Sequence, residues 1–141
     1  MEELSDRIGI SNNIPSTISK LDIPDIPKGP INPMSLGMVL GALIPENAII
    51  VDESVTTGRE FFYQTSGSHP HTWLNNCGGS IGFGMPVAIG AAISSPDQKV
   101  ISLEGDGSAM YTVQSLWTMA RENLDIVCLL YTSDAADEGG S

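Results

Sequence analysis

Apolar residues first take up a helical spacing near residue 33. Four aliphatic side chains fall on one face of a helix there: Leu36, Val39, Leu40 and Leu43. Asn32 and Pro33 come just before them, and these residue types are favoured at the N-cap and at the first helical position. The pattern therefore predicts a helix over residues 33–43 with one face turned towards a core.

Two short apolar runs predict strands. Residues 48–51 are apolar and partly β-branched, which is typical of a strand buried on both faces of a parallel sheet, and residues 99–103 predict a second strand. Each run leads into a polar cluster, residues 52–57 after the first and residues 104–108 after the second. Ligands bind beyond the carboxyl ends of strands in such sheets, so both clusters are expected at a binding edge.

Helical patterns occur between and after these runs. The Gly-rich stretch 75–84 leads into a predicted helix over residues 86–93. Another helix is predicted after Ser108, with an apolar face expected to pack on the sheet: Val113, Leu116, Trp117, Ala120 and Leu124. Strands that alternate with helices imply right-handed βαβ units, so the expected fold class is α/β, a parallel sheet in a three-layer arrangement.

Composition and charge narrow the class of protein. The chain has 141 residues, of which 41% are apolar, and this suits one domain with one core. The formal net charge of −11 argues against nucleic acid or an anionic membrane as a partner, because both require a basic surface. No window approaches the roughly 20 apolar residues that span a bilayer, and the amino terminus lacks a secretory layout. A cytoplasmic protein is therefore expected.

Prolines distinguish the start of the chain from the rest. Residues 1–30 contain Pro15, Pro24, Pro27 and Pro30, which fix φ repeatedly and remove backbone donors. We interpret residues 1–30 as an interdomain linker and residues 31–127 as the folded domain.

The second polar cluster has the chemistry of an anion and metal site. Gly105 and Gly107 allow a tight turn and a close approach of the backbone to a ligand, while the following helix offers amide groups. Mg²⁺ prefers carboxylate, carbonyl and phosphate oxygens, so Asp106 could hold a metal while Ser108 donates to a phosphate. The alternative is an ordinary strand-to-helix turn capped by Asp or Ser.

Three segments together resemble one enzyme family. The sequence GDGSA at residues 105–109, followed by Tyr111 and by LWT, resembles the cofactor motif of thiamin-diphosphate (ThDP) enzymes that act on 2-keto acids. The sequence GGSIGFGMP at residues 78–86 is similar to the family's preceding loop, and VDESVTT at residues 51–57 is similar to its first phosphate-side loop. The relatives resembled are acetolactate synthase large subunits and benzoylformate decarboxylases, and the fold implied is their diphosphate-binding domain.

This resemblance implies a role for each matched residue. Ile81 would lie beneath the cofactor and force its bent conformation, while its N–H and the Gly79 carbonyl would hold the pyrimidine. Asp106 would bind Mg²⁺, and Gly107 would allow the backbone to approach. The residues that would contact the diphosphate are Thr56, Ser108 and Tyr111. No catalytic residue is assigned in this chain, because the family's pyrimidine-activating glutamate comes from a separate domain. Neither His69 nor His71 matches a family position.

The carboxyl end departs from the family. The family's second metal ligand is an Asn, which corresponds here to Ser133. The sequence CLLYTSDAADE at residues 128–138 resembles the translation of a transposase adaptor used in sequencing libraries. We therefore expect residues 128–141 to be an adaptor-derived tail and the domain to be incomplete at its carboxyl end. Residues 128–131 continue the apolar run that starts at Ile126, so a strand is still expected there.

The resemblance implies a domain that binds ThDP and Mg²⁺ in a decarboxylase or carboligase of 2-keto acids. Acetolactate synthase-like chemistry is preferred over benzoylformate decarboxylase-like chemistry, and the parent enzyme is expected to be a homodimer or homotetramer. The 141-residue chain alone is expected to be inactive. Two rival functions stay open. A plain nucleotide- or phosphate-binding module would need a Lys near the phosphate loop, and none lies close in the sequence; an inert fragment would have the fold and no ligand.

Overall fold

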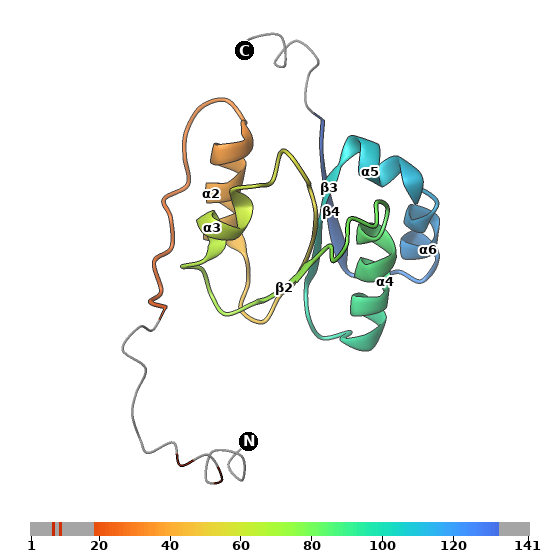
Figure 1. Ribbon diagram of the computed structural model, residues 1–141, viewed down its shortest axis with the longest axis horizontal. Helices are drawn as coiled ribbons and strands as arrows, with labels where there is room; N and C mark the ends of the chain where they lie inside the picture. Colours follow the sequence, from red (N-terminus) through yellow and green to blue (C-terminus); the bar gives the residue numbers. More distant parts are fainter. Residues whose placement is uncertain (1–6, 8, 10–18, 133–141) are drawn as a thin grey trace.

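A parallel sheet organises the part of the chain that the computed structural model describes, which is residues 7, 9 and 19–132 (Figure 1). Its four strands in this part lie in the order β2-β1-β3-β4. Their bounds are β1 Ile49–Glu53, β2 Thr72–Asn75, β3 Val100–Gly105 and β4 Ile126–Tyr131. All neighbouring pairs are parallel, so the polar clusters that follow β1 and β3 lie at the same edge of the sheet, as the sequence predicts.

Helices cover both faces of this sheet, which confirms the three-layer α/β fold (Figure 1). Helices α2 and α3 lie on one side, and α4, α5 and α6 lie on the other. Their bounds are α2 Pro33–Leu43, α3 Phe61–Thr65, α4 Gly84–Ser94, α5 Asp106–Tyr111 and α6 Ser115–Arg121. The sequence pattern predicted α2 at the observed bounds and α4 two residues too late, whereas it gave no sign of α3 or of the edge strand β2.

A hydrophobic cluster lies on each face of the sheet, between the strands and the helices that cover that face. Alternate residues of β1 point to opposite faces, so Ile49 and Val51 pack with α4 while Ile50 packs with α2. In β3, Val100 joins the first cluster, and Ile101 with Leu103 joins the second. Both strands are therefore buried on both faces, and this confirms what the apolar run at residues 48–51 predicted for the first of them.

Local hydrogen bonds define the start of α2. The Asn32 side chain accepts from the Ser35 amide at 2.8 Å, and the Ser35 hydroxyl accepts from the Asn32 amide at 2.8 Å. This is a capping box, and Pro33 at the first helical position has no N–H that would need a partner. The predicted apolar face is only partly buried: Leu40 lies in the core, whereas Leu43 is 63% exposed.

The helix predicted after Ser108 is wrong in its length and in its buried face. The chain there forms two short helices, α5 and α6, separated by residues 112–114. The buried residues of α6 are Ser115 and Met119, whereas Trp117 is 63% exposed and stacks under the Arg121 guanidinium at 4.5 Å. The break at Thr112, whose φ is −135°, resets the helical phase, so apolar spacing counted across it marks the wrong face.

The ends of the chain are only partly described. Residues 19–30 form neither helix nor strand, and the other residues assigned to the interdomain linker, apart from 7 and 9, lie outside the described part. Strand β4 includes residues 128–131 of the predicted tail, and residues 133–141, with Ser133 among them, lie outside the described part. No helix within the described residues is long and apolar enough to cross a membrane.

Candidate cofactor site at the carboxyl edge of the sheet

The polar clusters after β1 and β3 are direct neighbours. Glu53 at the end of β1 is in register with Glu104 of β3. A Cβ atom at Gly105 would lie 3.7 Å from the backbone carbonyl oxygens of both Glu53 and Ser54. The segment 51–57, here called the first segment, therefore lies against the segment 105–112, here called the GDGS segment.

A buried carboxylate joins the first segment to residues 78–86, here called the glycine segment. Glu53 is 2% exposed, and its two oxygens accept hydrogen bonds from separate backbone amides. Oε1 accepts from the Gly82 N–H at 2.5 Å, and Oε2 accepts from the Gly84 N–H at 2.7 Å. A carboxylate with two amide donors is a strong anchor. Sequence reasoning missed this anchor, and the signal that could have found it is a glutamate two positions after a predicted buried strand.

The glycine segment is also held by the GDGS segment. The Thr112 hydroxyl donates to the Gly82 carbonyl at 3.0 Å. Gly82 has φ +91°, and a Cβ there would lie 2.7 Å from the Cβ of Tyr111, so only glycine fits. The three segments that resemble the ThDP family are thus brought together at one edge of the sheet.

Most of the residues assigned a role by resemblance present their surfaces to solvent. Ile81 is 57% exposed and Tyr111 is 68% exposed, although both are apolar or aromatic. Also exposed are Thr56, Gly79, Asp106 and Gly107. Ser108 differs, because it is only 8% exposed. One oxygen of the Asp106 carboxylate accepts the Gly107 N–H at 2.8 Å, so this amide of α5 already has a partner.

A cavity of about 330 Å³ lies beside the first segment. Gly79 lines it together with residues that sequence reasoning did not consider, notably Arg59. Its lining residues are Asp52, Glu53, Val55, Gly58, Arg59, Phe62, Asn75, Asn76 and Gly79. Arg59 follows the matched Thr56 by three positions, and a cation at that distance from a phosphate-side loop could have been noticed in the sequence.

Glu104 is a buried carboxyl group at the site with only one of its oxygens hydrogen-bonded within the described structure. It is 1% exposed, its Oε1 accepts from the Ser102 hydroxyl at 2.5 Å, and its Oε2 has no hydrogen-bond partner among the described residues. Burial raises the pKa of Glu104 to about 7; the Ser102 hydrogen bond opposes this rise, and the nearby carboxylates of Glu53 and Asp52 add to it. The carboxyl group is therefore partly protonated at neutral pH.

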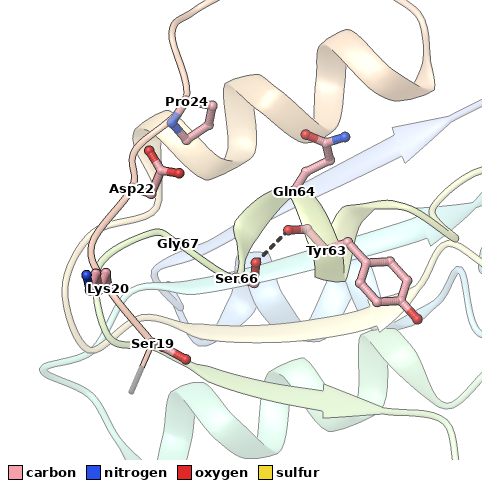
Figure 2. A pocket seen from close by; sticks show the side chains of 8 residues that line it. All are labelled: Ser19, Lys20, Asp22, Pro24, Tyr63, Gln64, Ser66 and Gly67. Atoms are coloured by element: carbon pink, nitrogen blue, oxygen red, sulfur yellow. Dashed lines mark hydrogen bonds between the residues drawn. The ribbon is translucent and has the colours of Figure 1, made fainter. Parts of the chain in front are cut away.

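A larger cavity, of about 490 Å³, lies elsewhere. Figure 2 shows it between the extended segment near Lys20 and the end of α3. It is lined by Ser19, Lys20, Asp22, Pro24, Tyr63, Gln64, Ser66 and Gly67. No residue of the first, glycine or GDGS segment lines it, so its size does not make it the candidate site.

The two histidines lie away from the three segments. His71 precedes β2, and its Nδ1 is 2.7 Å from the His69 carbonyl oxygen. Because the strands are parallel, the amino end of β2 belongs to the opposite edge of the sheet from Glu53 and Asp106. The position of these histidines gives no support to a catalytic role.

Known proteins resemble this chain in sequence and in fold. Residues 57–135 match the family described as thiamine pyrophosphate enzyme, C-terminal TPP binding domain. The protein IlvX of Mycobacterium tuberculosis, whose name describes an acetolactate synthase large subunit, is 49% identical over 114 residues, which is 81% of this chain and 22% of that protein. Benzoylformate decarboxylase of Pseudomonas aeruginosa is 35% identical over 102 residues, covering 72% of this chain and 19% of the enzyme.

The fold comparison agrees with the sequence comparison. The ThDP-dependent 4-hydroxybenzoylformate decarboxylase of Rhodococcus jostii RHA1 has a TM-score of 0.72 and 32% identity, over 93% of this chain and 25% of that structure. The chain thus spans about a fifth to a quarter of the length of these relatives. Its sequence, its parallel sheet and its three converging segments show that the chain belongs to the thiamine pyrophosphate enzymes and contains their C-terminal ThDP-binding domain.

Proposed function

We propose that the three segments bind ThDP together with Mg²⁺, as part of an enzyme that decarboxylates or ligates 2-keto acids. The observation that carries this proposal is the meeting of the three segments around Gly82, whose N–H binds Glu53 and whose carbonyl binds Thr112. Segments far apart in the sequence form one surface at the carboxyl edge of the sheet, where α/β folds bind ligands.

The residues present fit this cofactor. A Cβ at Gly79 or Gly107 would have no neighbour within 4 Å, so the backbone at both positions is open to a ligand. Ile81 is an exposed apolar side chain on a segment that is held in place, as a support for a ring system requires. In the proposed complex, Gly79 and Ile81 hold the pyrimidine, Thr56, Ser108 and Tyr111 contact the diphosphate, and Asp106 holds the metal.

Charge makes the metal a requirement of this proposal. The carboxyl groups of Asp52, Glu53, Glu104 and Asp106 cluster at the same edge of the sheet, and the whole chain carries a net charge of −11. A bare diphosphate would be repelled by them, whereas Mg²⁺ is attracted by Asp106 and neutralises the phosphate oxygens. Bound thiazolium supplies an electron sink for 2-keto acid chemistry. The chain's own part is to hold, orient and shield it.

Among possible reactions we favour acetolactate synthase-like chemistry, because identity is higher to IlvX, at 49%, than to benzoylformate decarboxylase, at 35%. A benzoylformate decarboxylase-like reaction is the second candidate, since the Rhodococcus enzyme shares the fold over 93% of the chain. The complete enzyme is proposed to be a cytoplasmic homodimer or homotetramer that takes a small 2-keto acid. The 141-residue chain alone is proposed to bind the cofactor without turnover.

Isothermal titration of the purified chain with ThDP tests the proposal. Binding is expected in the presence of Mg²⁺ and is expected to disappear when EDTA replaces the metal, because the carboxylates then face an uncompensated anion. Inorganic diphosphate is titrated as a comparison ligand. The Arg59→Ala variant is titrated with both ligands to test whether this cation alone accounts for binding. If diphosphate bound as tightly as ThDP, and Arg59→Ala abolished both, the chain would be a plain phosphate-binding module. If neither ligand bound, the chain would be an inert fragment.

A further inference from the structure

Both backbone hydrogen-bonding groups of Gly82 bind side chains, and these side chains come from two different segments. Its N–H donates to the Glu53 carboxylate of β1, and its carbonyl accepts the Thr112 hydroxyl that follows α5. These partners lie 29 positions before it and 30 positions after it in the sequence. Gly82 itself is buried, whereas Ile81 next to it is 57% exposed.

The same carboxylate also fixes the start of α4. Its second oxygen accepts the N–H of Gly84, the first residue of that helix, and Phe83 at the N-cap makes no side-chain cap hydrogen bond within the described structure. A negative charge at the amino end of a helix is favourable and satisfies an amide that lacks a helical partner. Glu53 therefore replaces the missing local cap and ties the glycine segment to the sheet.

We infer that Glu53 and Thr112 are positioning residues. They hold the backbone N–H and the backbone carbonyl of Gly82, and thereby fix the position and orientation of the neighbouring Ile81 on the site surface. Neither side chain needs to touch the cofactor, because both act through the backbone beside Ile81. An exposed isoleucine would otherwise be free to fold back onto the protein. This inference rests on the proposed binding of ThDP.

Thr112→Val is the decisive variant, because it removes the hydroxyl and keeps the shape, while Thr112→Ser keeps the hydroxyl. Thr112→Val is expected to weaken ThDP affinity in saturating Mg²⁺ by about three- to tenfold, which is the effect of one lost hydrogen bond. Thr112→Ser should stay within about twofold of wild type. In an Ile81→Ala background the effect of Thr112→Val should largely disappear, since the two residues act in series.

Amide hydrogen exchange measured by NMR on the cofactor-free chain tests the anchor separately. The Gly82 and Gly84 amides should exchange slowly in the wild type and about tenfold or more faster in Glu53→Gln, with the exposed Glu46→Gln as control. Fast exchange at Gly82 in the wild type, wild-type affinity in Thr112→Val, or an undiminished Thr112→Val effect in the Ile81→Ala background would each overturn the inference. Slow Gly82 exchange in a chain that binds no ThDP would instead overturn the proposed function and leave the anchor standing.

Discussion

Two glutamates at paired positions of the sheet have opposite environments. Glu53 and Glu104 are in register, and both are at most 2% exposed. Glu53 receives two amide hydrogen bonds, one on each carboxylate oxygen. Glu104 receives only the Ser102 hydroxyl on one oxygen, so burial decides its protonation and its pKa rises to about 7. One buried carboxylate thus serves as an anchor, and the other resists ionisation.

The raised pKa of Glu104 predicts a pH dependence of stability. Because the folded state binds this proton more tightly than the unfolded chain does, the free energy of unfolding should fall as pH rises from 4.5 to about 7 and then level off. The fall attributable to this group is on the order of 3 kcal/mol. Glu104→Gln should remove it, so the variant should gain stability relative to wild type across this range.

Urea denaturation in EDTA at several pH values measures this difference, with the exposed Glu46→Gln as control. A difference between wild type and Glu104→Gln that did not change between pH 5 and pH 8 would show that burial does not raise this pKa.

Asp106 is the single carboxylate assigned to the metal, and it is exposed. Asp106→Ala is expected to lower ThDP affinity in Mg²⁺ by at least about tenfold, because even outer partners of metal ligands are worth roughly 10- to 100-fold. Asp97→Ala provides the control, since Asp97 is also exposed but lies between α4 and β3, away from the carboxyl edge. Titration calorimetry gives both affinities. Equal cofactor affinity in Asp106→Ala and wild type would remove Asp106 from the metal site.

At the scale of elements, helix α4 links the core to the site. Its first residue, Gly84, lies next to the carboxyl groups of Glu53 and Glu104. Its buried residues Met85, Ala88 and Ala92 pack on β1 and β3. The absence of a side chain at Gly84 is what allows the helix to begin so close to the carboxylates. A Cβ there would lie 2.3 Å from Oε1 of Glu104 and 2.9 Å from Oε2 of Glu53.

The same substitution at two glycines of α4 should therefore have opposite effects. Gly84→Ala is expected to destabilise the chain by about 1–3 kcal/mol, because the new methyl group overlaps the carboxylates. Gly90→Ala should stabilise it by about 0.5–1 kcal/mol, since a Cβ at Gly90 would meet nothing within 4 Å and alanine favours a helix interior. Chemical denaturation followed by circular dichroism measures both. A neutral Gly84→Ala would show that the glutamates can move aside.

In the described part of the molecule as a whole, the surface proposed to bind the cofactor is exposed to solvent. Ile81, Asp106 and Tyr111 are all exposed in the described structure. The chain spans about a fifth of the length of IlvX and of benzoylformate decarboxylase. The family resemblance assigns the pyrimidine-activating glutamate to a separate domain and a second metal ligand to an Asn where this chain has Ser133. The 141-residue chain should therefore be able to bind ThDP without catalysing a reaction.

The purified 141-residue chain, saturated with ThDP and Mg²⁺, is expected to release no CO₂ from pyruvate or benzoylformate above the cofactor-only background. An open site also leaves water in contact with the cofactor, which lowers the benefit of every electrostatic contact. A full-length benzoylformate decarboxylase serves as the positive control for CO₂ detection. Decarboxylation by the chain alone would mean that the domain supplies its own acid–base group, and the proposed inactivity would be wrong.

Features that depend on local interactions could be predicted from the amino-acid sequence alone. Asn32, Pro33 and Ser35 specify the start of α2 through bonds that span three positions, so the helix could be predicted at its observed bounds. The apolar run of β1 predicted burial on both faces, and the polar clusters that follow the two predicted strands indicated the binding edge. The three segments also carried enough family resemblance to predict the fold, which the comparisons confirm.

Features that depend on distant partners could be identified only once the folded chain had brought those partners together. The role of Glu53 requires Gly82 and Gly84, which become its neighbours only when β1 and α4 pack together. The raised pKa of Glu104 arises from burial and from its register with Glu53, and no local pattern encodes either. The short edge strand β2 and the break at Thr112 escaped prediction for the same reason. Hydrogen bonds and packing between distant segments override local structural preferences. Because these interactions depend on which segments meet in the fold, the spacing of apolar residues along the chain does not reveal them.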